Sequence, residues 1–199
     1  MVTKKLVDVM VDLETLGRRA GCSVLSIGAV YFDPQTGKMG DELYVVVNRQ
    51  SCVELGLHED PETLAWWEAQ SAEAKTVLTQ AGLKKGSKAT GYSLKEPNKG
   101  IGRALDMLTE YLEPAGKRDV RVWGNGADFD NAILANCYAA ANRPMPWEFW
   151  NNRCFRTLKA LAPSVKMDRT GAHHNALDDA KTQAAHAAKV FAHLKSVRP

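Results

Sequence analysis

The chain has 199 residues, of which 45% are hydrophobic and 25% are charged, and its formal net charge is +3 at pH 7. This length favours one α/β domain over residues 1–199, with a single substantial core. The small positive charge is compatible with a polyanionic partner, but it excludes the strongly basic class of DNA-coating proteins.

The cysteines and the amino terminus restrict the class further. The first apolar stretch is broken by Asp8 and Asp12, which argues against a signal peptide and a membrane span. The four cysteines form no C-x-x-C pair, so neither a zinc ribbon nor a disulfide framework is predicted. We therefore expect a cytoplasmic protein with no membrane partner and with reduced thiols at Cys22, Cys52, Cys137 and Cys154.

Three strands are predicted at the start of the chain. The first spans residues 5–12, and runs rich in β-forming residues follow at 23–32 and 42–47. Glycine- and proline-containing turns at 17–21 and 33–37 connect them. The three strands should therefore form a consecutive antiparallel meander.

Two short helices are predicted next, one beginning at Asp60-Pro61 with Asp60 as its cap, and one running from Ser71 to near Gly82. Trp66 and Trp67 are adjacent in the first helix, and consecutive helical residues are ~100° apart, so they cannot share one face. One should enter the core while the other lines a groove. Whether that groove stacks a nucleobase, or both rings simply pack against protein, stays open.

Residues 82–100 are predicted to form a flexible basic loop, either merely solvated or able to guide a phosphate backbone. Its positive charges are Lys84, Lys85, Lys88, Lys95 and Lys99. An amphipathic helix is predicted over residues 101–113, with its apolar residues at helical spacing.

The second half of the chain begins with a short strand at 120–123, a glycine-rich turn and a helix at about 129–142. Such a turn places its residues at the carboxyl edge of the sheet, where α/β proteins commonly have their sites. Asp130 lies there, although a carboxylate in the first turn can also simply stabilise the helix dipole. Beyond it we predict a strand or packing segment at 147–150 and helices at 156–161 and 176–194.

Two acidic residues end the first strand. Side chains along a strand alternate faces, so Asp12 and Glu14 point the same way. Side by side, each carboxylate raises the pKa of the other unless a cation neutralises them. A divalent metal would do so, but the D-x-E pattern alone is a weak signal, because Asp8 shares that face and could simply be solvated.

A histidine and a third acidic segment stand at the start of the last helix. His174 is five residues before Asp179, and its ordinary pKa near working pH suits a general base. Asp12, Glu14, Asp130 and Asp179 together would supply hard oxygen donors. Such donors suit Mg²⁺ or Mn²⁺, and these ions indicate phosphoryl transfer.

Three motifs carry a resemblance to a known family. D-L-E-T at 12–15, N-G-A-D-F-D at 125–130 and H-N-A-L-D-D-A at 174–180 resemble, in order, the motifs of the DEDDh branch of DnaQ-like 3′-to-5′ exonucleases. The segments 61–71 and 26–33 are similar to the small bacterial and bacteriophage members. The resemblance implies an RNase H-like α/β fold with a mixed five-stranded sheet flanked by helices.

The resemblance also implies roles for the acidic residues. Asp12 would contact two divalent ions, Glu14 and Asp179 would hold the one that activates water, and Asp130 would hold the other. His174 would accept the proton of the attacking water, and its spacing selects Asp179 rather than Asp178. His173 matches no role and is expected in solvent. The expected contacts to the substrate are Leu13, Thr15, Leu16, Trp66, Trp67, Asn125 and Phe129.

The function that follows is metal-dependent removal of nucleoside 5′-monophosphates from the 3′ end of single-stranded RNA or DNA, or of 3′ overhangs. Two alternatives stay open: a scavenging nuclease for very short oligonucleotides, and a nucleic-acid-binding accessory subunit that retains the fold. The family often forms dimers, so a homodimer is possible, but no feature of the sequence defines an interface.

Overall fold

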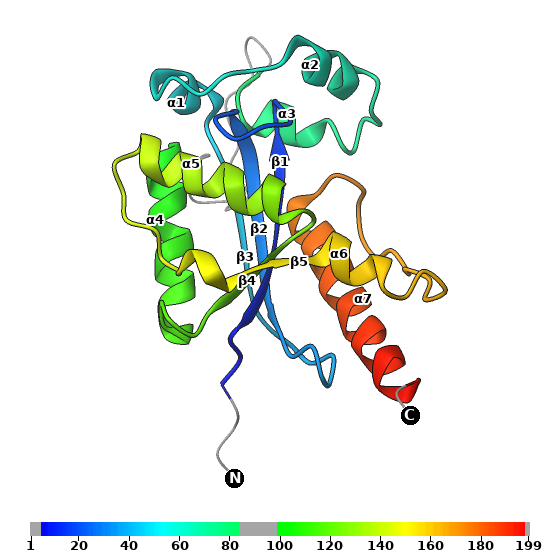
Figure 1. The fold of residues 1–199 in the computed structure, drawn as a ribbon. Helices are drawn as coiled ribbons and strands as arrows, with labels where there is room; N and C mark the ends of the chain where they lie inside the picture. The colour runs from blue at the N-terminus through cyan, green and yellow to red at the C-terminus, as the bar shows by residue number, and fades with distance from the viewer. Residues whose placement is uncertain (1–4, 84–98, 198–199) are drawn as a thin grey trace.

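The fold is known from a computed structural model that describes residues 5–83 and 99–197 (Figure 1). Most of the predicted basic loop, residues 84–98, lies outside the described residues. The described residues fold around one sheet with helices on both faces, as the sequence predicts.

The sheet has five strands in the order β3-β2-β1-β4-β5. β1 (Asp8–Thr15), β2 (Val24–Phe32) and β3 (Met39–Val46) are the predicted antiparallel meander. β4 (Arg121–Gly124) and β5 (Asn152–Cys154) extend the sheet in parallel on the other side of β1. The sheet is therefore mixed, with β1 at its centre and covered on both faces.

Four helices cover the two faces of the sheet (Figure 1). α4 (Ile101–Leu112) and α5 (Ala132–Ala140) pack on one face. α6 (Phe155–Ala160) and α7 (Ala176–Ser196) pack on the other. Each residue of β1 therefore faces one of two helix layers, according to its place in the strand alternation.

Three short helices gather at the end of the sheet where β1 stops (Figure 1). They are α1 (Arg49–Glu54), α2 (Pro61–Glu68) and α3 (Thr76–Gln80). Trp67 of α2 is 1% exposed and packs into a separate apolar cluster with Leu16 and Val77. This cluster closes one side of the space beyond β1.

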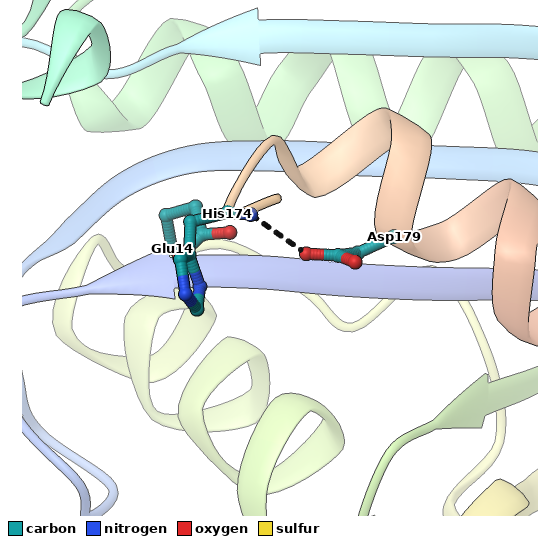
Figure 2. A group of neighbouring side chains, drawn as sticks. All are labelled: Glu14, His174 and Asp179. Atoms are coloured by element: carbon teal, nitrogen blue, oxygen red, sulfur yellow. Dashed lines mark hydrogen bonds between the residues drawn. The ribbon is translucent and has the colours of Figure 1, made fainter. Parts of the chain in front are cut away.

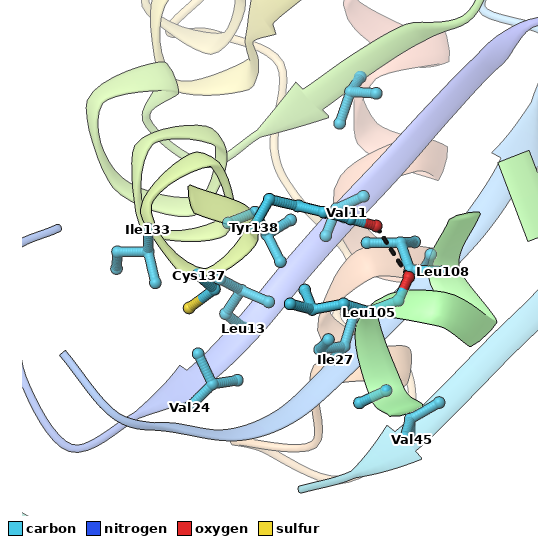
Figure 3. Close-up of a cluster of buried hydrophobic side chains, with 14 of the residues drawn as sticks. Val11, Leu13, Val24, Ile27, Val45, Leu105, Leu108, Ile133, Cys137 and Tyr138 are labelled. Atoms are coloured by element: carbon cyan, nitrogen blue, oxygen red, sulfur yellow. Dashed lines mark hydrogen bonds between the residues drawn. The ribbon is translucent and has the colours of Figure 1, made fainter. Parts of the chain in front are cut away.

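The largest apolar cluster lies between the sheet and the helices α4 and α5 (Figure 3). Val11 and Leu13 of β1 point into it, together with Leu105 and Leu108 of α4. Tyr138 donates its hydroxyl proton to the Leu105 carbonyl at 2.9 Å, so this buried polar group has a partner. With Val11 and Leu13 turned this way, Asp12 and Glu14 are left facing α7.

A glycine fixes how closely α7 approaches the sheet. Gly28 of β2 pairs with Asp12 of β1, and a Cβ atom at position 28 would lie 2.1 Å from the carbonyl carbon of Ala176. Any larger residue would collide with the backbone of the first turn of α7. The absence of a side chain therefore lets the start of α7 lie directly over the acidic end of β1.

The structure corrects several predicted elements. The strand predicted as an option at 147–150 is β5 at 152–154, while Trp147 is a packing residue, 1% exposed. The helix predicted at 129–142 begins with a wide turn at Ala127–Asn131 before α5. The strand predicted to end at residue 12 continues to Thr15. The helix α1 was not predicted at all.

Two polar residues also differ from their predictions. Asp60 precedes α2, but its side chain does not cap that helix and instead accepts a hydrogen bond from the Arg18 amide. Asp8 is not solvated: it is 4% exposed and accepts a hydrogen bond from the Trp123 indole at 2.9 Å. The partner of each side chain comes from a distant segment, which local patterns do not specify.

The four cysteines are free, as expected, with Cys154 partly exposed and the others buried. Within residues 5–83 and 99–197, no helix has both the length and the apolar character needed to cross a membrane.

Candidate active site

The acidic end of β1 forms the floor of the site. Asp12 is partly buried, and Glu14, two residues further along the same face, is 6% exposed. The neighbouring residues Val11 and Leu13 are anchored in the apolar cluster on the opposite face. The alternation of the strand thus forces both carboxylates into the space beneath α7.

Asp130 reaches the same space from the wide turn that follows β4. Its two carboxylate oxygens accept hydrogen bonds from the backbone amides of Leu13, at 3.2 Å, and Asn125, at 2.7 Å. Gly124 permits this approach, because a Cβ atom there would lie 2.9 Å from the Asp130 Cβ. The bond to Leu13 ties Asp130 to the middle of the D-L-E segment.

The start of α7 brings the last acidic residue. Asn175 caps the helix by accepting hydrogen bonds from the amides of Leu177 and Asp178. Asp179 is 8% exposed and turns toward β1, whereas Asp178 accepts a hydrogen bond from the Ala172 amide in the preceding loop. The two adjacent aspartates therefore have different partners, and Asp179 is the one that lies at the site.

His174 completes the group (Figure 2). Three residues, Glu14, His174 and Asp179, each offer one ligand atom, and these three atoms lie within 4.8 Å of one another. The His174 amide donates to Asp179 Oδ2 at 3.2 Å, and its backbone has a φ of 59°, in the left-handed region that side chains other than glycine seldom adopt. His173 is exposed, as expected.

Burial and mutual repulsion raise the pKa values of the acids. Burial raises the pKa of Glu14 to about 8, with further contributions from the charges of Asp179 and Asp130. The pKa of Asp12 is raised well above its ordinary value, first by burial and then by the three other acids. Burial raises the pKa of Asp130 to about 7 against the opposing effect of its backbone hydrogen bonds.

The imidazole of His174 lies against the tryptophans of α2. Its ring centroid is 4.9 Å from that of Trp66 and 6.0 Å from that of Trp67. Burial lowers the pKa of His174, although the charge of Asp179 opposes this shift. A lowered pKa favours the neutral imidazole, which is the form that can accept a proton.

Two residues that the sequence reasoning missed contact the acids directly. Arg169, in the loop before α7, donates to Asp179 Oδ1 at 2.6 Å. Gln183, one helical turn beyond Asp179, donates its side-chain amide to Asp12 Oδ1 at 2.7 Å. The i, i+4 spacing from Asp179 was a usable signal for Gln183, but no local pattern indicated Arg169.

The donor set fits divalent metal ions. Four carboxylates and one imidazole approach one another, and buried carboxylates are hard oxygen donors of the type that Mg²⁺ and Mn²⁺ prefer. Burial, and after it the negative charges of the neighbouring acids, raise the pKa values of Glu14 and Asp12. A bound cation would remove this repulsion.

A cavity of about 530 Å³ opens beside Glu14. Its walls combine aromatic rings from α2 and from the turn after β4 with the end of β1. Five of the expected substrate contacts line it: Leu13, Thr15, Trp66, Trp67 and Phe129. The cavity is large enough for a nucleotide, and its aromatic side chains suit base stacking.

The two tryptophans differ in burial, as their helical spacing predicts. Trp66 is 44% exposed and presents its ring to the cavity. Trp67 is buried, and its indole donates to the Thr15 carbonyl at 2.9 Å, which fixes the backbone at the end of β1.

Two of the expected substrate contacts are placed elsewhere. Leu16 is fully buried in the cluster around Trp67 and does not line the cavity. Asn125 offers its backbone instead, donating to Asp130 and accepting from Arg156 at 2.7 Å. Arg18 and Glu62, which pair with each other at the cavity, were not predicted.

Solved structures with the same fold are nucleases. The nuclease domain of 3′hExo, a DEDDh family member bound to rAMP, has a TM-score of 0.60 at 12% identity, over 96% of this chain and 94% of that one. E. coli Exonuclease I in complex with a 5cy-dT13 oligonucleotide has a TM-score of 0.63 at 11% identity, over 98% of this chain and 44% of that one.

Exonuclease X in complex with 5′ overhanging duplex DNA has a TM-score of 0.50 at 16% identity, over 94% of this chain and 92% of that one. A search of curated protein sequences finds no significant match. The mixed sheet and flanking helices are thus the RNase H-like fold of the DEDDh exonucleases.

Fold and sequence together define the class of protein, a 3′-to-5′ exonuclease. A family model described as the 3′-5′ exoribonuclease Rv2179c-like domain matches residues 7–191. Because the match covers most of the chain, the protein belongs to this family.

Proposed function

We propose that the protein hydrolyses the 3′-terminal phosphodiester of single-stranded RNA or DNA, or of 3′ overhangs, and releases nucleoside 5′-monophosphates. The observation that carries this proposal is the approach of Glu14, His174 and Asp179 to within 4.8 Å at the edge of the aromatic cavity. The proposal treats residues 1–199 as one exonuclease domain.

In this proposal Asp12, Glu14, Asp130 and Asp179 hold two divalent ions, Mg²⁺ or Mn²⁺. When bound, such ions stabilise the attacking and leaving oxygens of an in-line displacement at phosphorus. The chain itself fixes the carboxylates: backbone amides hold Asp130, Gln183 holds Asp12, and the His174 amide holds Asp179.

His174 is the proposed general base. Burial lowers its pKa, which favours the neutral ring, and it lies between the acids and the tryptophans. The terminal nucleotide would occupy the cavity, with its base against Trp66 and Phe129 and its sugar near Thr15. These positions would direct the phosphodiester to the carboxylates.

RNA is the proposed preferred substrate. The support is the description of the family as exoribonucleases. Related folds have been solved both with rAMP and with an oligodeoxynucleotide, so the fold itself accommodates either sugar. Contacts to the 2′-hydroxyl would decide between them.

The test is cleavage of 5′-labelled single-stranded RNA and DNA of graded length with Mn²⁺ or Mg²⁺. A ladder that shortens from the 3′ end, faster on RNA and absent with EDTA, is the expected result. Activity confined to the shortest oligonucleotides would instead identify a scavenging nuclease. Binding without cleavage of any strand would contradict the proposed reaction.

The base assignment has its own test, the variant His174→Ala. We expect slow residual cleavage that lacks the histidine-dependent limb of the pH profile, because water then loses its proton acceptor. His173→Ala is the matched control, since that neighbouring imidazole is exposed. A pH profile unchanged in His174→Ala would remove this residue from the base role.

Cytoplasmic location belongs to the proposal as well, with the four unpaired cysteines as its support. Homodimer formation is a further expectation, and light scattering of the purified protein would measure it.

A further inference from the structure

Gln183, a buried residue of α7, forms a hydrogen bond to one of the acids of the site. Its side-chain amide donates to Asp12 Oδ1 at 2.7 Å, from a residue only 6% exposed. Among the described residues, its amide oxygen is buried and finds no hydrogen-bond partner. The amide N–H group of Gln183 thus has a hydrogen-bond partner, whereas its buried amide oxygen has none.

The orientation of this amide is determined by its surroundings. If the amide were turned over, its oxygen would face a carboxylate oxygen at hydrogen-bond distance, and two acceptors repel each other. With Asp12 ionised, as metal binding requires, the N–H group therefore faces Asp12, and the unsatisfied oxygen is the consequence. A leucine would fill a similar space without an unsatisfied oxygen, but it would leave Asp12 Oδ1 without this donor, so the glutamine is best explained by its contact with Asp12.

The position of Gln183 on α7 makes the contact specific. It follows Asp179 by one turn, on the buried side of the helix, where half of the other buried residues are alanines. Gly28 holds the start of this helix against β2, opposite Asp12. One rigid helix therefore carries both Asp179 and the group that orients Asp12.

We propose that Gln183 is a positioning residue of the nuclease site, which holds the Asp12 carboxylate in one orientation relative to Asp179. The inference rests on the proposed function. A neutral amide suits this task, because it donates a hydrogen bond without a positive charge that would repel a metal ion. Arg169, the contact of Asp179, brings such a charge.

The test compares two variants that remove the donor with one matched control. Gln183→Leu and Gln183→Met keep a side chain of similar size but cannot donate to Asp12. The control is His186→Leu, a buried polar residue of α7 whose ring lies against Phe155. Thermal unfolding without metal would first verify that each variant folds, and the second Gln183 variant serves if the first does not.

The first readout is Mn²⁺ binding to the protein without substrate, by isothermal titration. Loss of a partner that orients a metal ligand typically costs about 10- to 100-fold in affinity or activity, and we expect this for both Gln183 variants. The second readout is steady-state cleavage, in which kcat should fall by a similar factor while KM changes about twofold or less. His186→Leu should leave both unchanged.

Unchanged Mn²⁺ affinity and kcat in the Gln183 variants would overturn the inference, as would an equal loss in His186→Leu. The titration also separates this inference from the proposed function. If the wild-type protein binds Mn²⁺ but cleaves no nucleic acid, the proposed function fails, whereas weakened Mn²⁺ binding in the Gln183 variants still supports the positioning role.

Discussion

At the scale of single residues, acids on the same face of β1 have different neighbours. Asp8, Asp12 and Glu14 all lie on one face, yet Asp8 pairs with the Trp123 indole and with Arg121 at 3.4 Å. Asp12 and Glu14 lie among other carboxylates, although Asp12 also accepts a hydrogen bond from Gln183. Distant segments therefore determine which groups surround each of these buried acids.

Asp12→Ala should therefore separate activity from stability. We expect cleavage to fall by more than the roughly 100-fold typical of residues that only orient a ligand. The melting temperature without metal should stay unchanged or rise, because a source of repulsion is removed. Activity assays and thermal unfolding in EDTA measure the two effects, and wild-type turnover would contradict the assignment of Asp12.

Asp8→Ala is the matched control on the same strand. It should retain cleavage but lose about 1–3 kcal/mol of stability, because the buried Trp123 indole loses its acceptor.

The adjacent tryptophans of α2 give a second prediction at this scale. Trp66→Ala should leave the fold stable, since this ring is 44% exposed, but should weaken substrate binding by the ~1–3 kcal/mol typical of one stacked base. Trp67→Ala should instead cost about 3–5 kcal/mol of stability, because that ring is buried. Equal effects of the two variants on both KM and melting temperature would contradict this division.

At the scale of elements, α7 determines the geometry of the site. Its cap residue Asn175, its acid Asp179 and its amide Gln183 are all fixed by one helix, which packs on both β1 and β2. His174 stands just before the cap, in a left-handed conformation that ends the loop. A shift of this helix would move every one of these groups together.

Gly28→Ala should produce such a shift. The added methyl group would lie 2.1–2.3 Å from backbone atoms of Ala176 and Leu177, which cannot yield as the end of a flexible side chain can. We expect a loss of about 3 kcal/mol or more, together with most of the activity, measured by denaturant unfolding and by cleavage. Gly100→Ala, with its nearest neighbour 3.8 Å away, is the control and should change little.

At the scale of the whole molecule, folding gathers four acids from three separated segments into one partly buried space. Glu14 has a pKa raised from an ordinary value of 4.5 to about 8, and that of Asp130 is raised to about 7. At pH values between the ordinary pKa of each acid and its raised pKa in the folded state, the folded protein binds more protons than the unfolded chain. By linkage, this contribution to stability is present at low pH and is lost as pH rises through the folded pKa values.

The melting temperature in EDTA should therefore fall as the pH is raised from about 5 to about 8. Saturating Mn²⁺ should reverse the trend, since metal binding requires the deprotonated carboxylates and becomes stronger with pH. Glu14→Gln should flatten the slope in EDTA. A melting temperature that rises over this range in EDTA, in the wild type and the variant alike, would contradict the account.

The sequence by itself indicated most of the elements and the exonuclease class. Alternation in the D-L-E-T segment placed Asp12 and Glu14 on one face, helical spacing separated Trp66 from Trp67, and three ordered motifs indicated the exonuclease class that the family match confirms. Strand and helix periodicities are local properties, so they can be read from neighbouring residues. The exceptions were short elements such as α1 and β5, whose residues are held by tertiary contacts.

Only the tertiary structure decided which polar groups meet. The contacts of Arg169 with Asp179, of Gln183 with Asp12 and of Trp123 with Asp8 join residues up to 171 positions apart in the chain. Leu16, adjacent to the D-L-E-T motif, turned into the core rather than the cavity. Hydrogen bonds and burial depend on the distance between atoms in space, and packing of α7 and α2 on the sheet sets those distances.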